Sequence, residues 1–423
     1  MSNAVPPLSE AVRAKVERIY AMPAVQSAMK QALDEAEFAK AEQIRISEIP
    51  SPTFKEEVRA QEIARLMREY GLTDVVIDPI GNVVGRRPGR MGGKGPVLAL
   101  GAHMDTVFPE GTDVRVRQEG NVYYGPGLGD NASNLRSIMQ ILRCLRDNAI
   151  ETEGDLLFVG TVGEEGNGDI RGSKALFDGS RHIDGFLALD SSDPTRILCG
   201  ATGSHRWRVT MKGTGGHSYA AFGKVPSAIH AMGRAIAIIS DFEVPADPKT
   251  TFTVGVVNGG TTVNTIAAEC SVEVDMRSVD NASLLALEEK VLAAFKKGAE
   301  LENARWGITD EEARVKPVFE QIGNRPAGMR PDDCPVLQCA RSAQIMLGIK
   351  LGKYMPSSTD ANAPMSLGIP STCISSGGIG RGAHTIDENF IFEDIHLGPQ
   401  LALLTALALV GTGGEAPELP VRA

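Results

Sequence analysis

Histidines and carboxylates recur in polar, often glycine-containing segments that follow short apolar runs of this 423-residue chain. The first such segment carries His103 and Asp105, directly after the apolar run at 96–100. Side chains alternate with a period of two along an extended backbone, so His103 and Asp105 point the same way. A carboxylate behind a histidine fixes the ring and raises its basicity, which suits a metal ligand. An ordinary loop histidine beside a helix cap is the alternative interpretation.

Three further segments carry carboxylates in comparable positions. They are Asp130 at the end of a glycine-rich loop at 125–130, the neighbours Glu164 and Glu165 after the run at 155–161, and Asp190 after the run at 185–189. Adjacent carboxylates repel each other unless cations or protons neutralise them, so the glutamate pair suggests a metal site with a spare base. A helix-capping aspartate and a solvated charged turn are the alternatives for Asp130 and for the pair.

The fifth segment places His384 in a turn that follows the glycines Gly377 and Gly378. Ligands bind at the carboxyl edge of sheets of this kind, and all five segments follow predicted strands or turns at that edge. Zn²⁺ accepts a mixture of nitrogen and oxygen ligands, and a carboxylate can bridge two ions. The sequence therefore predicts a divalent-metal site at one edge of a sheet.

The elements that must position these residues alternate between strands and helices. Alternation of this kind predicts an α/β domain with a mixed, largely parallel sheet. The strand signals lie at 96–100, 155–161, 185–189 and 368–374, and the helices at about 24–45, 54–70, 133–145 and 397–410.

The pattern changes near Gly203, where residues 205–211 alternate as a half-exposed antiparallel strand does. A helix, two strands and a second helix follow, which together make most of a small α+β, ferredoxin-like sandwich. We therefore expect residues 1–202 and 322–423 to form a catalytic α/β domain, interrupted by a smaller inserted domain at 203–321.

Composition excludes several classes of function. Lys+Arg 43 against Asp+Glu 53 gives a net charge of −10, which argues against nucleic-acid and anionic-membrane partners. No run reaches the ~18–20 apolar residues that a membrane helix needs. Six scattered cysteines without a Cys-x-x-Cys pair predict reduced, buried thiols in a cytoplasmic protein. The chain lacks a Gly-x-Ser-x-Gly nucleophile elbow and a His-Glu-x-x-His zinc motif.

The order of the motifs resembles that of one known family. The blocks are His-x-Asp-Thr-Val at 103–107, Gly-x-Gly-x-x-Asp at 125–130, Glu164-Glu165-Gly166, Thr-Asp-Ala-Asn at 359–362, Gly-Ile-Pro at 368–370 and His384-Thr385. In this order the chain resembles the co-catalytic zinc peptidases that include aminoacylase, carnosinase, bacterial glutamate carboxypeptidase, succinyl-diaminopimelate desuccinylase and tripeptidase T. The resemblance runs from about residue 49 onward and is closest to the tripeptidase T-like peptidases.

The resemblance implies a role for each matching residue. His103 and Asp190 would bind one metal ion, Glu165 and His384 the other, and Asp130 both; Asp105 would support His103, and Glu164 would be the general base. In the inserted domain, His217 would reach the site of a partner subunit, and Asn264 and Arg277 would bind a substrate carboxylate or the oxyanion. Gly377 and Gly378 lie where relatives bind the substrate backbone, with a simple turn as the alternative. Ala132 and Ser133 depart from the family's usual lysine and glycine.

The implied activity is hydrolysis of an amide bond in small peptides, in an aminopeptidase-like direction. The implied cofactors are two divalent ions, zinc first, with cobalt or manganese as alternatives. The inserted domain would serve as a lid and would join two chains as a homodimer. An N-acyl amino-acid deacylase or desuccinylase is the alternative enzyme, and a metal-free binding protein is a remote third reading.

Overall fold

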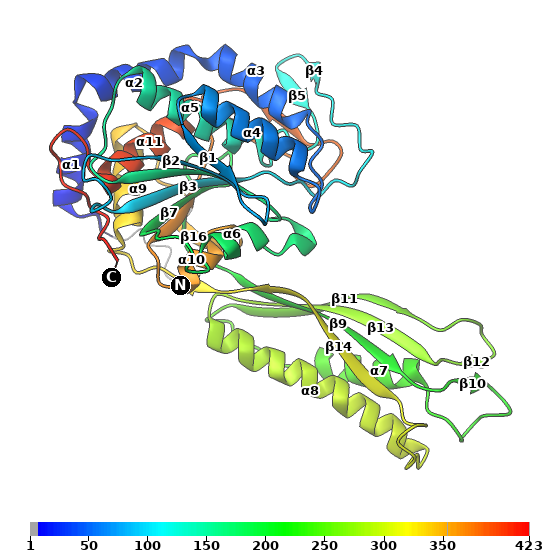
Figure 1. Ribbon diagram of the computed structural model, residues 1–423. Coiled ribbons are helices and arrows are strands. Elements are labelled where there is room, and N and C mark those ends of the chain that lie inside the picture. Colours follow the sequence, from blue (N-terminus) through cyan, green and yellow to red (C-terminus); the bar gives the residue numbers. More distant parts are fainter. Residues whose placement is uncertain (1–6, 353, 423) are drawn as a thin grey trace. The chain divides into compact units, whose positions relative to one another are not determined.

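A computed structural model describes residues 7–352 and 354–422 (Figure 1). Contacts divide the chain into an inserted unit, Thr202–Gly328, and a discontinuous unit made of the segments before and after it. The inserted unit ends later than the expected boundary at residue 321. The reason is β14 (Lys316–Arg325), which pairs with β9 (Gly203–Lys212) up to Arg325 and so keeps the chain inside the inserted unit.

A six-stranded mixed sheet forms the centre of the discontinuous unit, in the order β1-β2-β6-β3-β7-β17. The strands are β1 (Asp74–Ile77), β2 (Val83–Arg87), β3 (Val97–His103), β6 (Asp155–Thr161), β7 (Gly185–Leu189) and β17 (Ser371–Ile374). The last four run parallel to one another, whereas β1 and β2 are antiparallel to their neighbours. The expectation of a mixed, largely parallel sheet is confirmed.

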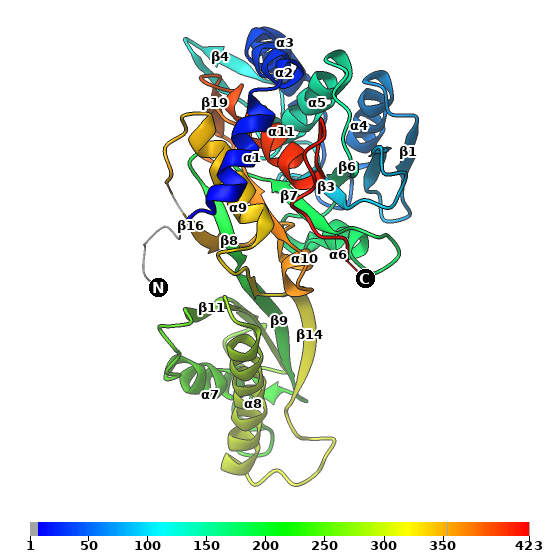
Figure 2. The same cartoon turned by 90° about the vertical axis from the view of Figure 1, so that its left-hand side faces the viewer.

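Apolar side chains cover both faces of this sheet. Leu98 and Leu100 of β3 enter one core, and Ala99 between them enters the other. This double burial explains why the strands are continuous apolar runs. The first core packs α1 (Glu10–Tyr20), α2 (Pro23–Asp34), α3 (Ala36–Ser47), α4 (Glu57–Glu69), α5 (Ala132–Asp147), α9 (Pro335–Met346) and α11 (Leu397–Val410), many of which face the viewer in Figure 2. The second packs α6 (Arg171–Leu176) and α10 (Asn362–Ser366).

The helix expected at 24–45 is two helices, because the helical conformation is interrupted at Glu35. This residue caps the end of α2 and the start of α3. No glycine or proline marks this break in the sequence. Among the described helices, none is long and apolar enough to cross a membrane. The most apolar stretch, α11, is buried along almost its whole length by the other helices.

A four-stranded antiparallel sheet brings together two distant loops. Its order is β18-β19-β5-β4, with β18 (Ile379–Arg381), β19 (Asn389–Ile391), β5 (Val122–Tyr124) and β4 (Arg117–Glu119). Asn389 pairs with Tyr124, so the loop that follows β5 begins beside the residues that precede β19. Elsewhere, β8 (Ile197–Ala201) pairs in parallel with β16 (Tyr354–Ser357), η1 covers Gly166–Gly168, and β15 is Gly328–Met329.

The inserted unit has the βαββαβ order of a ferredoxin-like sandwich, as expected. After β9 come α7 (Ala228–Ser240), β11 (Thr250–Gly259), β13 (Glu269–Ser278), α8 (Asn281–Arg305) and β14. The sheet order is β11-β13-β9-β14, and all neighbours are antiparallel. Apolar residues of the strands pack against α7 and α8. A two-residue ladder of β10 (Gly216–His217) and β12 (Thr265–Ile266) extends the unit.

Candidate metal centre

Three adjacent parallel strands bring four of the predicted residues to one edge of the central sheet. His103 is the last residue of β3, Asp190 directly follows β7, and Glu164 and Glu165 follow β6 within four residues. Because β6, β3 and β7 are parallel neighbours, their carboxyl ends meet at the same edge. Asp130 arrives from the loop before α5, and His384 from the segment between β18 and β19.

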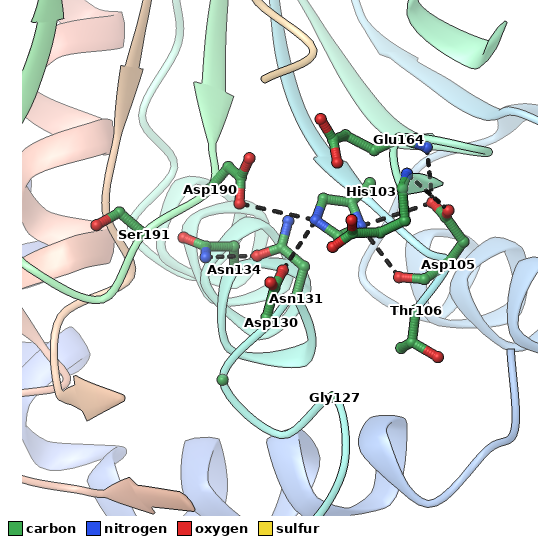
Figure 3. Close-up of polar contacts among 12 residues, drawn as sticks. His103, Asp105, Thr106, Gly127, Asp130, Asn131, Asn134, Glu164, Asp190 and Ser191 are labelled. Atoms are coloured by element: carbon green, nitrogen blue, oxygen red, sulfur yellow. Dashed lines mark hydrogen bonds and ion pairs between the residues drawn. The ribbon is translucent and has the colours of Figure 1, made fainter. Parts of the chain in front are cut away.

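The buried ring of His103 faces two carboxylates (Figure 3). Its Nε2 lies 3.1 Å from Oδ1 of Asp130 and 3.7 Å from Oδ1 of Asp190. Nδ1 lies 3.0 Å from the backbone oxygen of Asp105. Burial alone would lower the pKa of His103, but the three aspartates around the ring outweigh it and raise that pKa well above 6.5.

The other oxygen of Asp130 faces a second histidine. Nε2 of His384 lies 3.2 Å from Oδ2 of Asp130 and 2.9 Å from Oε1 of Glu165. Hydrogen bonds with these two carboxylates raise the pKa of His384 to about 10. Burial would raise the pKa of Asp130, but the two histidines outweigh it and hold that pKa below its usual range. One carboxylate therefore belongs to two groups of potential ligands.

Asp105 is fully buried and ties the end of β3 to the glutamate loop. Its carboxylate accepts hydrogen bonds from the backbone amides of Glu164 at 2.9 Å and Glu165 at 3.0 Å. The hydroxyl of Thr53 donates a third, at 2.9 Å. Burial works to raise the pKa of Asp105, but His103 and the two amides hold it below its ordinary value. Asp105 thus sets the position of both His103 and the glutamate pair.

The residues present fit divalent metal ions. His103 with Asp130 and Asp190 forms one group of donor atoms within 4.8 Å of one another, and Asp130 with Glu165 and His384 forms a second. Nε2 of His103 and Oδ1 of Asp130 are buried, yet neither has a hydrogen-bond partner. Buried polar atoms are normally partnered, so this pair indicates a cation binding between them. Histidine nitrogen and carboxylate oxygen are donors that Zn²⁺ accepts.

Two further buried carboxylates lie near this centre, Glu388, which the sequence did not single out, and Asp360, which belongs to the block at 359–362 and lies where relatives bind the substrate backbone. Glu388 accepts hydrogen bonds from the backbone amides of Gly127, Gly129 and Asp130, and burial raises its pKa to about 7. Asp360 accepts one from the hydroxyl of Thr161, and burial raises its pKa to about 6. No sequence pattern identifies Glu388, because its partners are backbone amides that only the β19–β5 pairing brings near.

Packing alone accounts for the two glycines after β17. Gly377 and Gly378 have φ angles of 72° and 85°, which favour glycine. A Cβ on Gly378 would lie 2.3 Å from the ring of Phe390, and one on Gly377 would lie 2.8 Å from the backbone oxygen of Asp394. The turn interpretation therefore explains both residues, and a role in binding substrate remains a prediction.

The three predicted residues of the inserted unit do not gather in one place within that unit. His217 and Asn264 are neighbours, because the amide of Ser218 donates to the backbone oxygen of Asn264 at 2.9 Å. Strand β13 begins at Glu269, at the end of the unit that holds β12 (Figure 1). Arg277 lies eight residues further along this strand, a distance of roughly 27 Å from Glu269 at the usual rise per residue.

Hydrogen bonds orient two of these side chains. The amides of Tyr219 and Ala220 donate to Nδ1 of His217, at 3.2 and 3.4 Å, so a neutral ring carries its proton on Nε2. Nε of Arg277 donates to Oδ2 of Asp275 at 2.8 Å, which leaves the rest of its guanidinium fork half exposed.

Comparisons with known proteins agree with this geometry. A putative [LysW]-lysine/[LysW]-ornithine hydrolase of Pyrococcus abyssi is 36% identical over 129 residues, 30% of this chain and 33% of that protein. The chain thus matches about a third of the length of this relative. The uncharacterized protein YqjE of Bacillus subtilis is 26% identical over 304 residues, 70% of this chain and 76% of its own.

Aminopeptidase PepT from Bacillus cereus has the same fold, with a TM-score of 0.71 over 88% of this chain and 97% of its own, at 23% identity. The model of peptidase family M20/M25/M40 matches residues 99–408, which is well over half of the chain and contains all the predicted site residues. The expected resemblance to metal-dependent peptidases is thereby confirmed, and this chain belongs to peptidase family M20/M25/M40.

Proposed function

We propose that this protein hydrolyses an amide bond in small peptides, and that it does so with two divalent metal ions, of which zinc is the preferred candidate. The observation that carries the proposal is the carboxylate of Asp130, whose two oxygens face His103 and His384. His103 and Asp190 would hold one ion, and Glu165 and His384 the other. Cobalt or manganese would fit the same donors.

Bound ions would supply a water that is acidic enough to lose a proton near neutral pH. Glu164 is the residue in place to receive that proton. Its side chain is buried, and its carboxylate belongs to a group of donor atoms with His103 and Glu165. Asp105 fixes its backbone amide, so the carboxylate works from a defined position. Glu164 would accept the proton at a carboxylate oxygen and then pass it to the leaving nitrogen.

His217, Asn264 and Arg277 would complete the site from the inserted unit. The Nε2 proton of His217 is the kind of donor that stabilises an oxyanion, and the free part of the Arg277 fork suits a substrate carboxylate. Because His217 and Arg277 lie at opposite ends of the same unit, we propose that one site takes them from two chains.

A homodimer would supply this arrangement. Large apolar side chains are exposed around His217 and Asn264, namely Tyr219 (89% exposed), Phe222 (67%) and Val263 (103%). Exposed apolar patches of this kind mark surfaces that bind other proteins. The six cysteines are free and buried, which suits a reducing compartment, and we place the protein in the cytoplasm.

The test of the activity is amine release by the zinc-reconstituted protein from two matched substrate sets. One set holds unblocked di- and tripeptides, and the other holds N-acetyl and N-succinyl amino acids. Cleavage of the unblocked set alone supports a peptidase, and the products give the direction of cutting. Cleavage of the acylated set alone would identify a deacylase and overturn the peptide substrate. Absence of cleavage in both sets would contradict the proposed substrate class altogether.

A further inference from the structure

Half of the residues in the loop at 125–130 that carries Asp130 are glycines, which have little conformational preference of their own. Glycines occupy positions 125, 127 and 129, and Gly127 has a φ of 76°. Glycine loses more conformational freedom on folding than any other residue, so such a loop needs contacts from outside to hold one shape. Asp130 is also the residue with the strictest geometric demand, because its two oxygens must face two different histidines.

Glu388 supplies those outside contacts. Oε2 accepts the amide of Gly127 at 2.8 Å, and Oε1 accepts the amides of Gly129 at 2.8 Å and of Asp130 itself at 2.9 Å. The backbone oxygen of Glu388 accepts a fourth hydrogen bond, from Gly125 at 3.0 Å. The side chain is only 1% exposed, so water does not compete for these amides. One carboxylate thereby fixes the backbone on the amino side of the Asp130 side chain.

Ser133 holds the same loop from its other side. Its hydroxyl donates to the backbone oxygen of Gly129 at 2.6 Å and accepts from the hydroxyl of Ser376 at 2.9 Å. Gly129 is thus held through its amide by Glu388 and through its carbonyl by Ser133. This contact explains how the chain accommodates serine where the family usually has glycine.

We propose that Glu388 is a positioning residue for Asp130, and that its hydrogen bonds to the loop amides set the affinity of the centre for metal. The proposal rests on the proposed two-metal function. Glu388 does not belong to either group of donor atoms that shares Asp130, so its effect on metal passes through the backbone that it holds. Gln43 of α3 also donates to the loop, from Nε2 to the backbone oxygen of Leu128 at 2.9 Å. Ser133 and Gln43 are weaker supports than Glu388, because each makes one hydrogen bond to the loop where Glu388 makes four.

The test is zinc binding by the full-length apoprotein, measured by competition with a chromophoric chelator and followed without any substrate. In Glu388→Gln, the side-chain NH₂ group replaces one acceptor oxygen. This donor then faces a backbone N–H of the loop, so at least one hydrogen bond is lost. We expect this variant to bind zinc about tenfold to hundredfold more weakly than the wild type, as is typical for groups that orient metal ligands. Excess zinc should then restore turnover, because Glu388 itself does not touch the reacting atoms.

Glu42→Gln is the matched control. Glu42 is a similarly buried carboxylate on α3, and its hydrogen bonds come from Tyr70 and from Arg143 of α5 and not from the amides of the loop. We expect Glu42→Gln to lower the melting temperature and to leave zinc affinity unchanged. Wild-type affinity in a folded Glu388→Gln would overturn the positioning role, as would an equal loss of affinity in Glu42→Gln.

Zinc binding by Glu388→Asp and by the wild type covers the cases in which Glu388→Gln alone gives no answer. If Glu388→Gln does not fold, Glu388→Asp takes its place, since the shorter carboxylate keeps its charge but cannot reach all three amides. Unchanged zinc affinity in that variant overturns the proposal. Failure of the wild type to bind zinc would instead contradict the two-metal function on which the positioning role rests, so the two failures are distinguishable.

Discussion

The edge of the central sheet and the inserted unit differ in how many of their predicted site residues one chain brings together. At the sheet edge, five segments of a single chain place two histidines and three carboxylates in two groups that share Asp130. In the inserted unit, His217 and Asn264 are neighbours, whereas Arg277 lies at the opposite end of β13. Under our proposal, one chain is sufficient to bind metal, whereas substrate chemistry needs residues from two chains.

Replacing Glu164 separates metal binding from chemistry within the sheet edge itself. Because Glu164 is proposed to move the proton and not to hold metal, Glu164→Gln should lower kcat by about 10²–10⁴ and leave the zinc content unchanged. Kinetics and metal analysis on the same sample check both statements. Undiminished turnover by the zinc-loaded variant would remove Glu164 from the mechanism.

His217 tests the inserted unit. Loss of one oxyanion donor should lower kcat of His217→Ala by about 10²–10³, again with zinc retained. Mixing this variant with Glu164→Gln under conditions of subunit exchange should then regenerate one intact site in each mixed dimer, about a quarter of all sites. Regained activity shows that His217 acts on the partner chain, and a mixture that stays inactive would contradict that role.

Arg277 should affect binding more than chemistry. Loss of a charge-assisted contact to a substrate carboxylate should raise KM of Arg277→Ala by about tenfold to hundredfold, with kcat little changed. Substrates with an amidated carboxyl terminus should show no difference between variant and wild type. A fall in kcat at unchanged KM would assign Arg277 to the reaction step instead.

Zinc affinity should rise with pH. Asp130 and Glu165 raise the pKa of His384 to about 10 in the metal-free protein, so its ring is protonated near neutrality and must lose a proton before it binds metal. Each proton released makes affinity rise about tenfold per pH unit below that pKa. Chelator competition at about pH 6.5 and about pH 8.5 measures the slope. A flat profile would mean that His384 binds no metal.

The same group has the opposite effect on the metal-free fold. A pKa raised above the ordinary value of 6.5 stabilises the folded protein below that value, and this contribution is lost as pH rises towards about 10. The melting temperature of the apoprotein should therefore fall over the range in which zinc affinity rises. A melting temperature that climbs with pH would show that other groups control the stability of the apoprotein.

The buried parts of the fold were the most predictable from sequence. The strands at 155–161 and 185–189 and the helix at 397–410 match the structure at both ends, because double burial leaves continuous apolar runs. The break at Glu35 was missed, since neither glycine nor proline marks it. The later end of the inserted unit depends on the pairing of β14 with β9, which the local pattern does not reveal.

Side chains with chemical roles were more predictable than those that hold them. His103, Asp130 and His384 carry residue types that bind metal, and their motifs appear in a known order. Glu388 acts on three backbone amides of a loop some 260 positions away in sequence. Such contacts follow from the β19–β5 pairing and leave no pattern in the sequence around them.

The most direct test of this account is the number of zinc ions per chain, measured by mass spectrometry after equilibration with zinc and removal of the excess. The shared carboxylate predicts about two ions per chain in the wild type and fewer than one in Asp130→Ala, because both groups lose a ligand at once. One ion or none in the wild type, or two ions in Asp130→Ala, would contradict a two-metal centre built on Asp130.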